Sequence, residues 1–226
     1  MDVSLIVLAA GNSSRMDGCN KQVMILDDKK PVLVHTLQAF EKITSIHEII
    51  LVTREQDIIL IGDMLKNFHV NEKVKAIVPG GATRQDSVIA GLQHVTGEKV
   101  LIHDGARPFV TETMVDSLIR VLVDADAVIP GVPVKDTIKR KTDSNEVLET
   151  LPREDLIAVQ TPQGFTTRMI VDAHQKARED GVLVTDDASV AEYAGISVKI
   201  ISGDYQNIKI TTPDDILIAN AICMGR

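Results

Sequence analysis

The chain has 226 residues, of which 44% are hydrophobic and 3% aromatic, and its formal net charge is -8 at pH 7. This length and hydrophobic content fit one large α/β domain with a sizeable core, and they argue against a disordered chain. The acidic balance and the scarcity of aromatic rings argue against a nucleic-acid partner. No apolar run approaches the roughly 20 residues of a membrane span. Two cysteines are too few for a disulfide framework, so we expect a cytoplasmic protein.

The predicted elements alternate between strands and helices along the chain. An almost unbroken apolar run at residues 3–8 predicts a first strand that is buried on both faces, as in a parallel sheet. Further strands are predicted at residues 48–53, 74–78, 99–103, from 127, 198–201 and 208–210. Helices are predicted at residues 31–43, 56–68, 83–95, 111–123, 167–179, 185–195 and from 212. This order predicts a Rossmann-like, three-layer α/β fold, with a mostly parallel twisted sheet and helices on both faces.

The alternation is interrupted by a polar segment that follows the strand starting at 127. Two β-like stretches, 137–140 and 147–150, flank a turn signal at 143–145 and predict a hairpin. An isolated hairpin is marginally stable in water, so it needs a surface to pack on. We therefore expect a single domain with a protruding arm at about 134–153, and a second copy of the chain in a homodimer as the arm's partner. Residues 156–159 then have the composition of a core segment.

A loop of small residues follows the first strand. Ala9, Ala10 and Gly11 allow a backbone to approach a ligand closely, and Arg15 and Lys21 add positive charge. Consecutive backbone N–H groups in such a loop form an anion-binding concavity. The spacing matches neither the G-x-G-x-x-G pattern of dinucleotide-binding loops nor the G-x-x-x-x-G-K-[ST] pattern of P-loops. We interpret the loop as a triphosphate cradle of another class of nucleotide-using enzyme.

The segment from Leu8 to Gln22 resembles the signature of the sugar-phosphate nucleotidyltransferases. Further segments make the chain similar, over nearly its whole length, to the 2-C-methyl-D-erythritol 4-phosphate cytidylyltransferase family. These segments are Gly80-Gly81-x-x-Arg84-x-x-Ser87-Val88, His103-Asp104-Gly105-Ala106-Arg107-Pro108, Thr185-Asp186-x-Ala188-Ser189 and Asn207-Ile208-Lys209-Ile210-Thr211. The resemblance implies transfer of a cytidylyl group from CTP to 2-C-methyl-D-erythritol 4-phosphate in the non-mevalonate isoprenoid pathway, with release of pyrophosphate. It also implies Mg²⁺ or another divalent cation.

The same resemblance implies roles for individual residues. The catalytic cations would be Arg15, Lys21 and Lys209. The CTP-binding residues would be Ala9, Ala10, Gly11, Gly81, Arg84, Ser87, Asp104 and Gly105. The residues around the acceptor sugar and its phosphate would be Arg107, Thr137, Arg153, Thr161, Thr185 and Asp186, with the hairpin reaching across the dimer. Asp104 is the candidate protein ligand for the metal, which is otherwise held through the CTP phosphates.

The chemistry of the implied reaction agrees with the absence of a Ser/His/Asp or Cys/His arrangement. The nucleophile is an oxygen of a phosphate monoester, whose second pKa is about 6, so that no general base is needed. His103 ends a predicted strand and is expected to be a packing or turn residue.

The chain departs from the family pattern at several positions. Asn20 stands where the family usually has Pro, and Ala82 and Thr83 stand where an acidic residue is common. Pro152 stands where Asp is usual, which removes a carboxylate that would orient Arg153.

Other functions remain open at this stage. A ribitol-5-phosphate cytidylyltransferase would share the fold and most motifs, although Gly105-Ala106 and Ala188-Ser189 favour methylerythritol phosphate. A molybdenum-cofactor guanylyltransferase would match the first motif but not the cytidine and arm segments. A non-catalytic nucleotide-binding module would lack at least one phosphate-clamping cation, whereas Arg15, Lys21 and Lys209 are all present.

Overall fold

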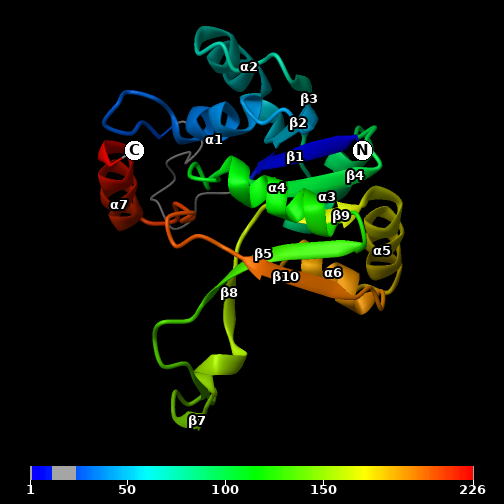
Figure 1. The fold of residues 1–226 in the computed structure, drawn as a ribbon, viewed down its shortest axis with the longest axis vertical. Helices are drawn as coiled ribbons and strands as arrows, with labels where there is room; N and C mark the ends of the chain where they lie inside the picture. The colour runs from blue at the N-terminus through cyan, green and yellow to red at the C-terminus, as the bar shows by residue number, and fades with distance from the viewer. Residues whose placement is uncertain (1, 12–23, 226) are drawn as a thin grey trace.

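The computed structural model describes residues 2–11 and 24–225, and its centre is an eight-stranded sheet. The strands of this sheet are β1 (Val3–Ala9), β2 (Ile46–Thr53), β3 (Val74–Pro79), β4 (Lys99–Asp104), β5 (Ala127–Pro133), β8 (Ile157–Val159), β9 (Gln163–Thr166) and β10 (Val198–Ser202). Their order is β10-β5-β9-β4-β1-β2-β3, and β8 pairs with β5 (Figure 1). The pairs are parallel except those made by β8 and β9, so the predicted mostly parallel sheet is confirmed.

Helices cover both faces of the sheet. They are α1 (Val32–Glu41), α2 (Ile58–Asn67), α3 (Arg84–Leu92), α4 (Glu112–Val121), α5 (Thr167–Glu179), α6 (Asp187–Tyr193) and α7 (Pro213–Met224). A short 3₁₀ turn (Glu55–Asp57) precedes α2. Along β1 the buried side chains alternate: Leu5 and Val7 pack with α1, α2 and α4, whereas Ile6 packs with α3, α5 and α6. The two-residue period of a strand thus builds two core layers, as the predicted three-layer fold requires.

Three predicted segments differ from the structure. Residues 208–210 are not a strand but an irregular segment, which the bond from Ile210 N to Ala106 O (2.9 Å) holds against the loop after β4. The antiparallel strand β9 lies at residues for which the sequence predicted no strand. Gly164 is needed there for packing, since a Cβ would lie 2.8 Å from the Leu122 side chain. Strand β8 is exposed rather than part of the core.

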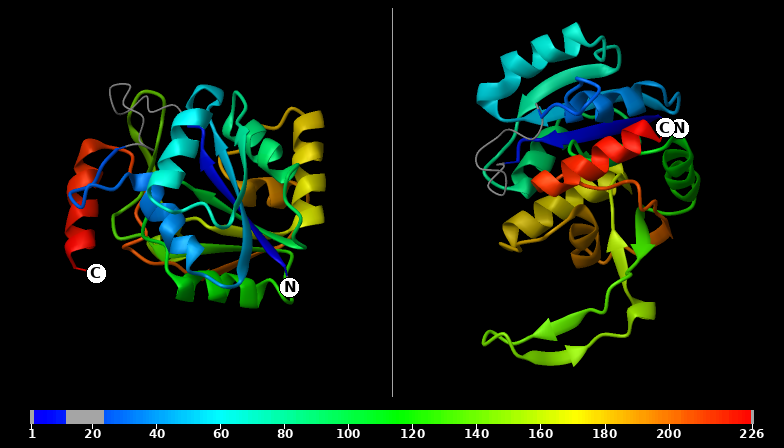
Figure 2. Two further views of the ribbon diagram at one scale, coloured as in Figure 1. Left: turned by 90° about the horizontal axis from the view of Figure 1, so that it is seen from above. Right: turned by 90° about the vertical axis from the view of Figure 1, so that its left-hand side faces the viewer.

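The predicted hairpin is confirmed and stands away from the sheet (Figures 1 and 2). Strands β6 (Lys139–Lys141) and β7 (Val147–Thr150) pair antiparallel, and all of their side chains are exposed. Asn145 has a φ of 62° in the turn between them, a conformation that Asn tolerates better than most residues. In the described ranges no helix has the length and apolar character to span a membrane.

The strand register brings several loops together at one edge of the sheet. Ala9 is paired with Thr53, Thr53 with Pro79, and Leu8 with Asp104. Strands β1 to β4 are parallel to one another, so their carboxyl ends meet at this edge. Ligands of open α/β sheets bind at such an edge.

Candidate active site

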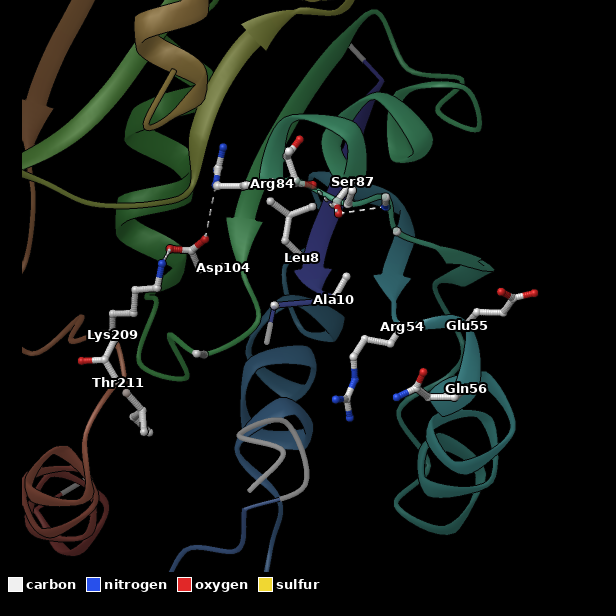
Figure 3. A pocket seen from close by; sticks show the side chains of 17 residues that line it. Leu8, Ala10, Arg54, Glu55, Gln56, Arg84, Ser87, Asp104, Lys209 and Thr211 are labelled. Atoms are coloured by element: carbon white, nitrogen blue, oxygen red, sulfur yellow. Dashed lines mark hydrogen bonds and ion pairs between the residues drawn. The ribbon is translucent and has the colours of Figure 1, made fainter. Parts of the chain in front are cut away.

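A cleft of about 610 Å³ opens at the carboxyl edge of β1, β2, β3 and β4 (Figure 3). We call it the nucleotide cleft. Residues 10–11, 54–56 and 80–84 line it, and Lys209 to Thr211 form the opposite wall. The cleft is therefore built from loops that follow parallel strands and from the irregular segment before α7.

The glycine pair after β3 forms one wall of the cleft. Gly80 N donates to Thr53 O at 2.7 Å, and Gly81 N donates to the Ser87 hydroxyl at 3.2 Å. A Cβ on Gly80 would lie 2.5 Å from the Cβ of Ala10 and 2.7 Å from the Ser87 hydroxyl oxygen. Only a residue without a side chain fits this close approach.

Helix α3 begins directly after this wall and carries Arg84 and Ser87. Its N-terminus is a capping box, in which the Thr83 hydroxyl accepts from Asp86 N and the Asp86 carboxylate accepts from Thr83 N. The box fixes the first turn of the helix. Arg84 is thereby held at the cleft, directed towards the end of β4 (Figure 3).

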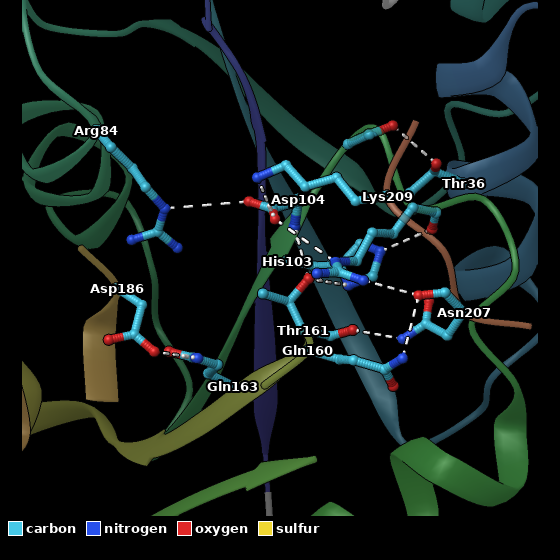
Figure 4. Close-up of polar contacts among 12 residues, drawn as sticks. Thr36, Arg84, His103, Asp104, Gln160, Thr161, Gln163, Asp186, Asn207 and Lys209 are labelled. Atoms are coloured by element: carbon cyan, nitrogen blue, oxygen red, sulfur yellow. Dashed lines mark hydrogen bonds and ion pairs between the residues drawn. The ribbon is translucent and has the colours of Figure 1, made fainter. Parts of the chain in front are cut away.

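Asp104, the last residue of β4, is surrounded by three cationic side chains (Figure 4). One carboxylate oxygen lies 2.8 Å from Lys209 Nζ and 3.6 Å from Arg107 Nε, and the other lies 4.0 Å from Arg84 Nε. Burial alone would raise the pKa of Asp104, but the charges of Lys209, Arg84 and Arg107 outweigh it and lower this pKa to about 2. Asp104 is therefore ionised at neutral pH.

A chain of hydrogen bonds connects the backbone of Asp104 to Thr161 and His103 (Figure 4). The Thr161 hydroxyl accepts from Asp104 N at 3.0 Å and lies 3.1 Å from His103 Nδ1. His103 Nε2 lies 3.0 Å from the Arg107 carbonyl, which can only accept, so Nε2 carries the proton and Nδ1 accepts from Thr161. Burial lowers the pKa of His103 to about 4, consistent with this neutral form. His103 is thus the packing and turn residue that we predicted, with both ring nitrogens engaged.

Most of the predicted CTP-binding residues come together in the structure. Ala10, Gly11, Gly81, Arg84, Ser87, Asp104 and the catalytic candidate Lys209 all line the nucleotide cleft. Ala9 does not, because its side chain packs in the core. Gly105 is buried behind the cleft, where its carbonyl accepts from the Thr36 hydroxyl at 2.9 Å. Arg15 and Lys21 lie outside the described residues.

The predicted acceptor-site residues are spread more widely. Arg107 lies beside Asp104 and donates to the carbonyl of Asn207 at 2.7 Å, whereas Thr161 is buried beneath Asp104. Asp186 caps α6 by accepting from Ser189 N, and Thr185 precedes it in an exposed position. Thr137 and Arg153 are exposed residues of the arm, and neither is among the described residues that line the nucleotide cleft.

Sequence reasoning missed part of the cleft. Arg54, Glu55 and Gln56 line it from the side of β2 (Figure 3). Their position immediately after a predicted parallel strand was the available signal. Asp187 was not among the predicted site residues, but it is buried and pairs with Arg84, with 2.6 Å between Asp187 Oδ2 and Arg84 Nη2.

Comparison with known proteins agrees with the geometry of the cleft. The model of the 2-C-methyl-D-erythritol 4-phosphate cytidylyltransferase family matches residues 3–225. The chain belongs to this family. It is therefore a cytidylyltransferase, an enzyme of the nucleotidyltransferase class.

Individual members of the family are similar over nearly their full length. The chain is 47% identical to the 2-C-methyl-D-erythritol 4-phosphate cytidylyltransferase of Halalkalibacterium halodurans, over 98% of this chain and 97% of that protein. It is 44% identical to the Bacillus licheniformis enzyme of the same name, over 98% and 96%. A crystal structure of 4-diphosphocytidyl-2C-methyl-D-erythritol synthase from Anaerococcus prevotii has a TM-score of 0.87 at 34% identity, covering 99% of this chain and 96% of that one. These similarities do not favour the ribitol-phosphate alternative.

Proposed function

We propose that the nucleotide cleft binds CTP and that the chain transfers its cytidylyl group to 2-C-methyl-D-erythritol 4-phosphate, with release of pyrophosphate, in isoprenoid precursor synthesis. The observation that carries this proposal is the convergence of Lys209, Arg84 and Arg107 on Asp104 at the edge of the cleft. These cations come from separate segments of the chain, and a triphosphate is the kind of ligand that such a cluster holds.

The reaction joins two polyanions. An oxygen of the acceptor phosphate attacks the α-phosphorus of CTP, and the bond to the pyrophosphate oxygen breaks, so that pyrophosphate leaves with the electron pair. Because the attacking phosphate is already mostly ionised at neutral pH, no side chain has to remove a proton. The task of the protein is to position the two phosphates and to stabilise the charge that develops between them.

Lys209 is the described cation best placed for this task. Its side chain is 42% exposed, and its ammonium group is held 2.8 Å from the Asp104 carboxylate at the wall of the cleft. We assign it to the α-phosphate. Arg15 and Lys21, which follow β1 in the sequence, are assigned to the triphosphate.

The glycine wall and α3 are suited to the nucleoside. Gly81, Arg84 and Ser87 are assigned to the cytosine and ribose, and the backbone of Ala10 and Gly11 to the nucleotide near its phosphates. Backbone groups and one hydroxyl are sufficient to read a pyrimidine edge, because each supplies a directed donor or acceptor.

A divalent cation fits this site with few protein ligands. The described residues contain no group of three or more His, Cys, Asp or Glu side chains that would hold a metal by themselves. Mg²⁺ is commonly bound through one or two carboxylates together with substrate phosphates. Asp104 is the carboxylate that we assign to this role, and the metal when bound would neutralise phosphate charge.

The acceptor side of the site is assigned to two copies of the chain. Arg107, Thr185 and Asp186 come from the chain that holds CTP, and the buried Thr161 supports Asp104 there. Thr137 and Arg153 come from the arm of the partner in a homodimer. Exposed apolar side chains on the arm and on β8, namely Val147, Leu148, Ile157 and Val159, are suited to packing against a second copy.

The proposal is tested by mixing the protein with CTP, Mg²⁺ and one acceptor at a time, and by measuring pyrophosphate. We expect release with 2-C-methyl-D-erythritol 4-phosphate and much less with ribitol 5-phosphate. Lys209→Ala is the control for a contaminating activity and should abolish most of the release. The proposal is wrong if neither acceptor supports release, and the substrate assignment is wrong if ribitol 5-phosphate is preferred.

A further inference from the structure

The guanidinium of Arg84 forms an ion pair with Asp187, which is not among the described residues that line the nucleotide cleft. Its Nη2 lies 2.6 Å from Oδ2 of Asp187, the first residue of α6, while its Nε lies 4.0 Å from Asp104 at the cleft wall. The guanidinium therefore spans two carboxylates. The shorter contact, and hence the stronger restraint, is the one to Asp187.

Asp187 is itself rigidly placed. It is 0% exposed, and the N-terminus of α6 is attached to β9 through Gln163. The side-chain Oε1 of Gln163 accepts from Asp187 N at 3.1 Å and from Ala188 N at 3.0 Å, and its Nε2 donates to Asp186 Oδ2 at 2.8 Å. The backbone of Asp187 is thus fixed to strand β9 of the central sheet, and this restricts where its carboxylate can lie.

A second buried side chain, that of His174, lies against the carboxylate of Asp187. His174 on α5 is 1% exposed, and its Nε2 lies 3.4 Å from Asp187 Oδ1. Burial alone would raise the pKa of Asp187, but Arg84 and His174 outweigh it and lower this pKa. A buried carboxylate that stays ionised has to keep its cation close, because separating the pair leaves an uncompensated buried charge.

We infer that Asp187 is a positioning residue that holds the Arg84 guanidinium at the wall of the nucleotide cleft, with His174 supporting Asp187 from α5. The inference rests on the proposed binding of CTP in that cleft. Without Asp187, Arg84 is free to adopt other rotamers and to pair with Asp104 alone, so that its contribution to CTP binding falls. A purely structural ion pair between α3 and α6 would instead affect folding and leave the nucleotide site unchanged.

The test is a double-mutant cycle made of Asp187→Asn, Arg84→Ala and the variant with both changes, with KM measured for CTP and for the acceptor. Asp187→Asn keeps the size of the side chain and removes its charge. Losing a charged hydrogen-bond partner typically costs a factor of about ten or more, so we expect each single variant to raise the KM for CTP by about tenfold and to change the acceptor KM little. In the Arg84→Ala background, Asp187→Asn should have no further effect on the KM for CTP, because there is no guanidinium left to position.

Asp180→Asn is the matched control. Asp180 is an exposed residue at the end of α5 that accepts from the Tyr193 hydroxyl of α6 at 2.7 Å. The same chemical change there should leave the KM for CTP unchanged. If Asp187→Asn does not fold, Asp187→Glu takes its place, because it keeps the buried charge and displaces the carboxylate from Arg84 by one methylene. It should also raise the KM for CTP, and an unchanged KM would contradict the inference.

Two results would overturn the inference. One is that Asp187→Asn folds but leaves the KM for CTP as in the parent chain. The other is that it raises this KM by the same factor whether or not Arg84 is present. A readout without nucleotide separates the inference from the proposed function: in NMR spectra of the free protein, the Arg84 Nε–H signal should be sharp in the parent chain and broadened or shifted in Asp187→Asn.

Discussion

At the scale of single residues, Asp104 determines the electrostatics of the nucleotide cleft. One buried carboxylate brings together Lys209, Arg107 and Arg84, which are far apart in the sequence. Cations gathered without such a carboxylate would repel one another in a poorly solvated site. Asp104 therefore allows a chain with net charge -8 to present a local positive cluster to a polyanion.

The lowered pKa of His103, the residue next to Asp104, gives a prediction of how the free energy of unfolding depends on pH. The pKa of His103 is about 4 in the folded protein, whereas its ordinary value, expected in the unfolded chain, is 6.5. Between about pH 4 and pH 6.5 the unfolded chain therefore binds one more proton than the folded protein. The contribution of His103 is therefore complete above about pH 6.5 and is lost as the pH falls towards about 4. In that window we expect the free energy of unfolding to fall by up to about 1.4 kcal/mol per pH unit on account of this side chain.

Urea unfolding at a series of pH values measures this dependence. His103→Gln places an amide nitrogen near the position of Nε2 and removes the titratable ring. The free energy of unfolding of this variant should therefore fall less steeply with decreasing pH than that of the parent chain. Parallel pH profiles for the two proteins would contradict the assignment of a neutral, buried His103.

At the scale of elements, the cleft depends on loops that follow parallel strands along one sheet edge, and on the capped helix α3 after one of them. The unit β3–Gly80-Gly81–α3 is tightly packed, because Gly80 lies between Ala10 and Ser87. The periodicity of strands and helices was readable in the sequence. Strand β9 could not be recognised in the sequence. Its Gly164 is required for close packing in the core and not for a turn, and a glycine in the sequence does not show which of the two applies.

Gly80→Ala is expected to damage the cleft. Its Cβ would overlap the Cβ of Ala10 and the hydroxyl of Ser87, so the end of β1 and the first turns of α3 would have to shift. We expect a loss of about 1–3 kcal/mol in unfolding free energy and a higher KM for CTP. The matched control is Gly62→Ala in α2, where the nearest atom is Ile77 Cδ1 at 3.8 Å and where Ala should stabilise the helix by up to about 1 kcal/mol. Thermal unfolding and kinetics of both variants check this, and an unchanged KM in Gly80→Ala would count against the close-packed wall.

At the scale of the whole molecule, the arm stands out because all side chains of its strands β6 and β7 are exposed. Its base is tied to the body, because the Tyr205 hydroxyl donates to the Pro133 carbonyl at 2.7 Å and Lys135 lies 3.8 Å above the Tyr205 ring. Arg153 donates to the Lys135 carbonyl at 2.7 Å, at the same base. Arg153 is not among the described residues that line the nucleotide cleft of its own chain, so we expect a direct role in the reaction to need a second copy.

Mixed dimers test this arrangement. Arg153→Ala chains keep an intact cleft, and Lys209→Ala chains keep an intact arm. If the arm acts on the partner's cleft, unfolding and refolding the two variants together should restore activity at low acceptor concentration, because each mixed dimer contains one complete site. Random pairing makes half of the dimers mixed, so about a quarter of the parent activity is expected. No recovery above the separate variants would show that the arm does not act across a dimer.

The sequence by itself determined the elements and their order, because burial on one or both faces of a strand or helix leaves a local period in the chain. It also determined that Gly80, Gly81 and Asp104 follow parallel strands, and hence that they meet at one edge of the sheet. Only the tertiary structure decided which charges pair there. Arg84 and Asp187 are 103 positions apart, and among the described residues the exposed Arg153 does not line the nucleotide cleft of its own chain. Such contacts depend on how whole helices and segments pack, and long-range packing leaves no periodic signal in the residues that it brings together.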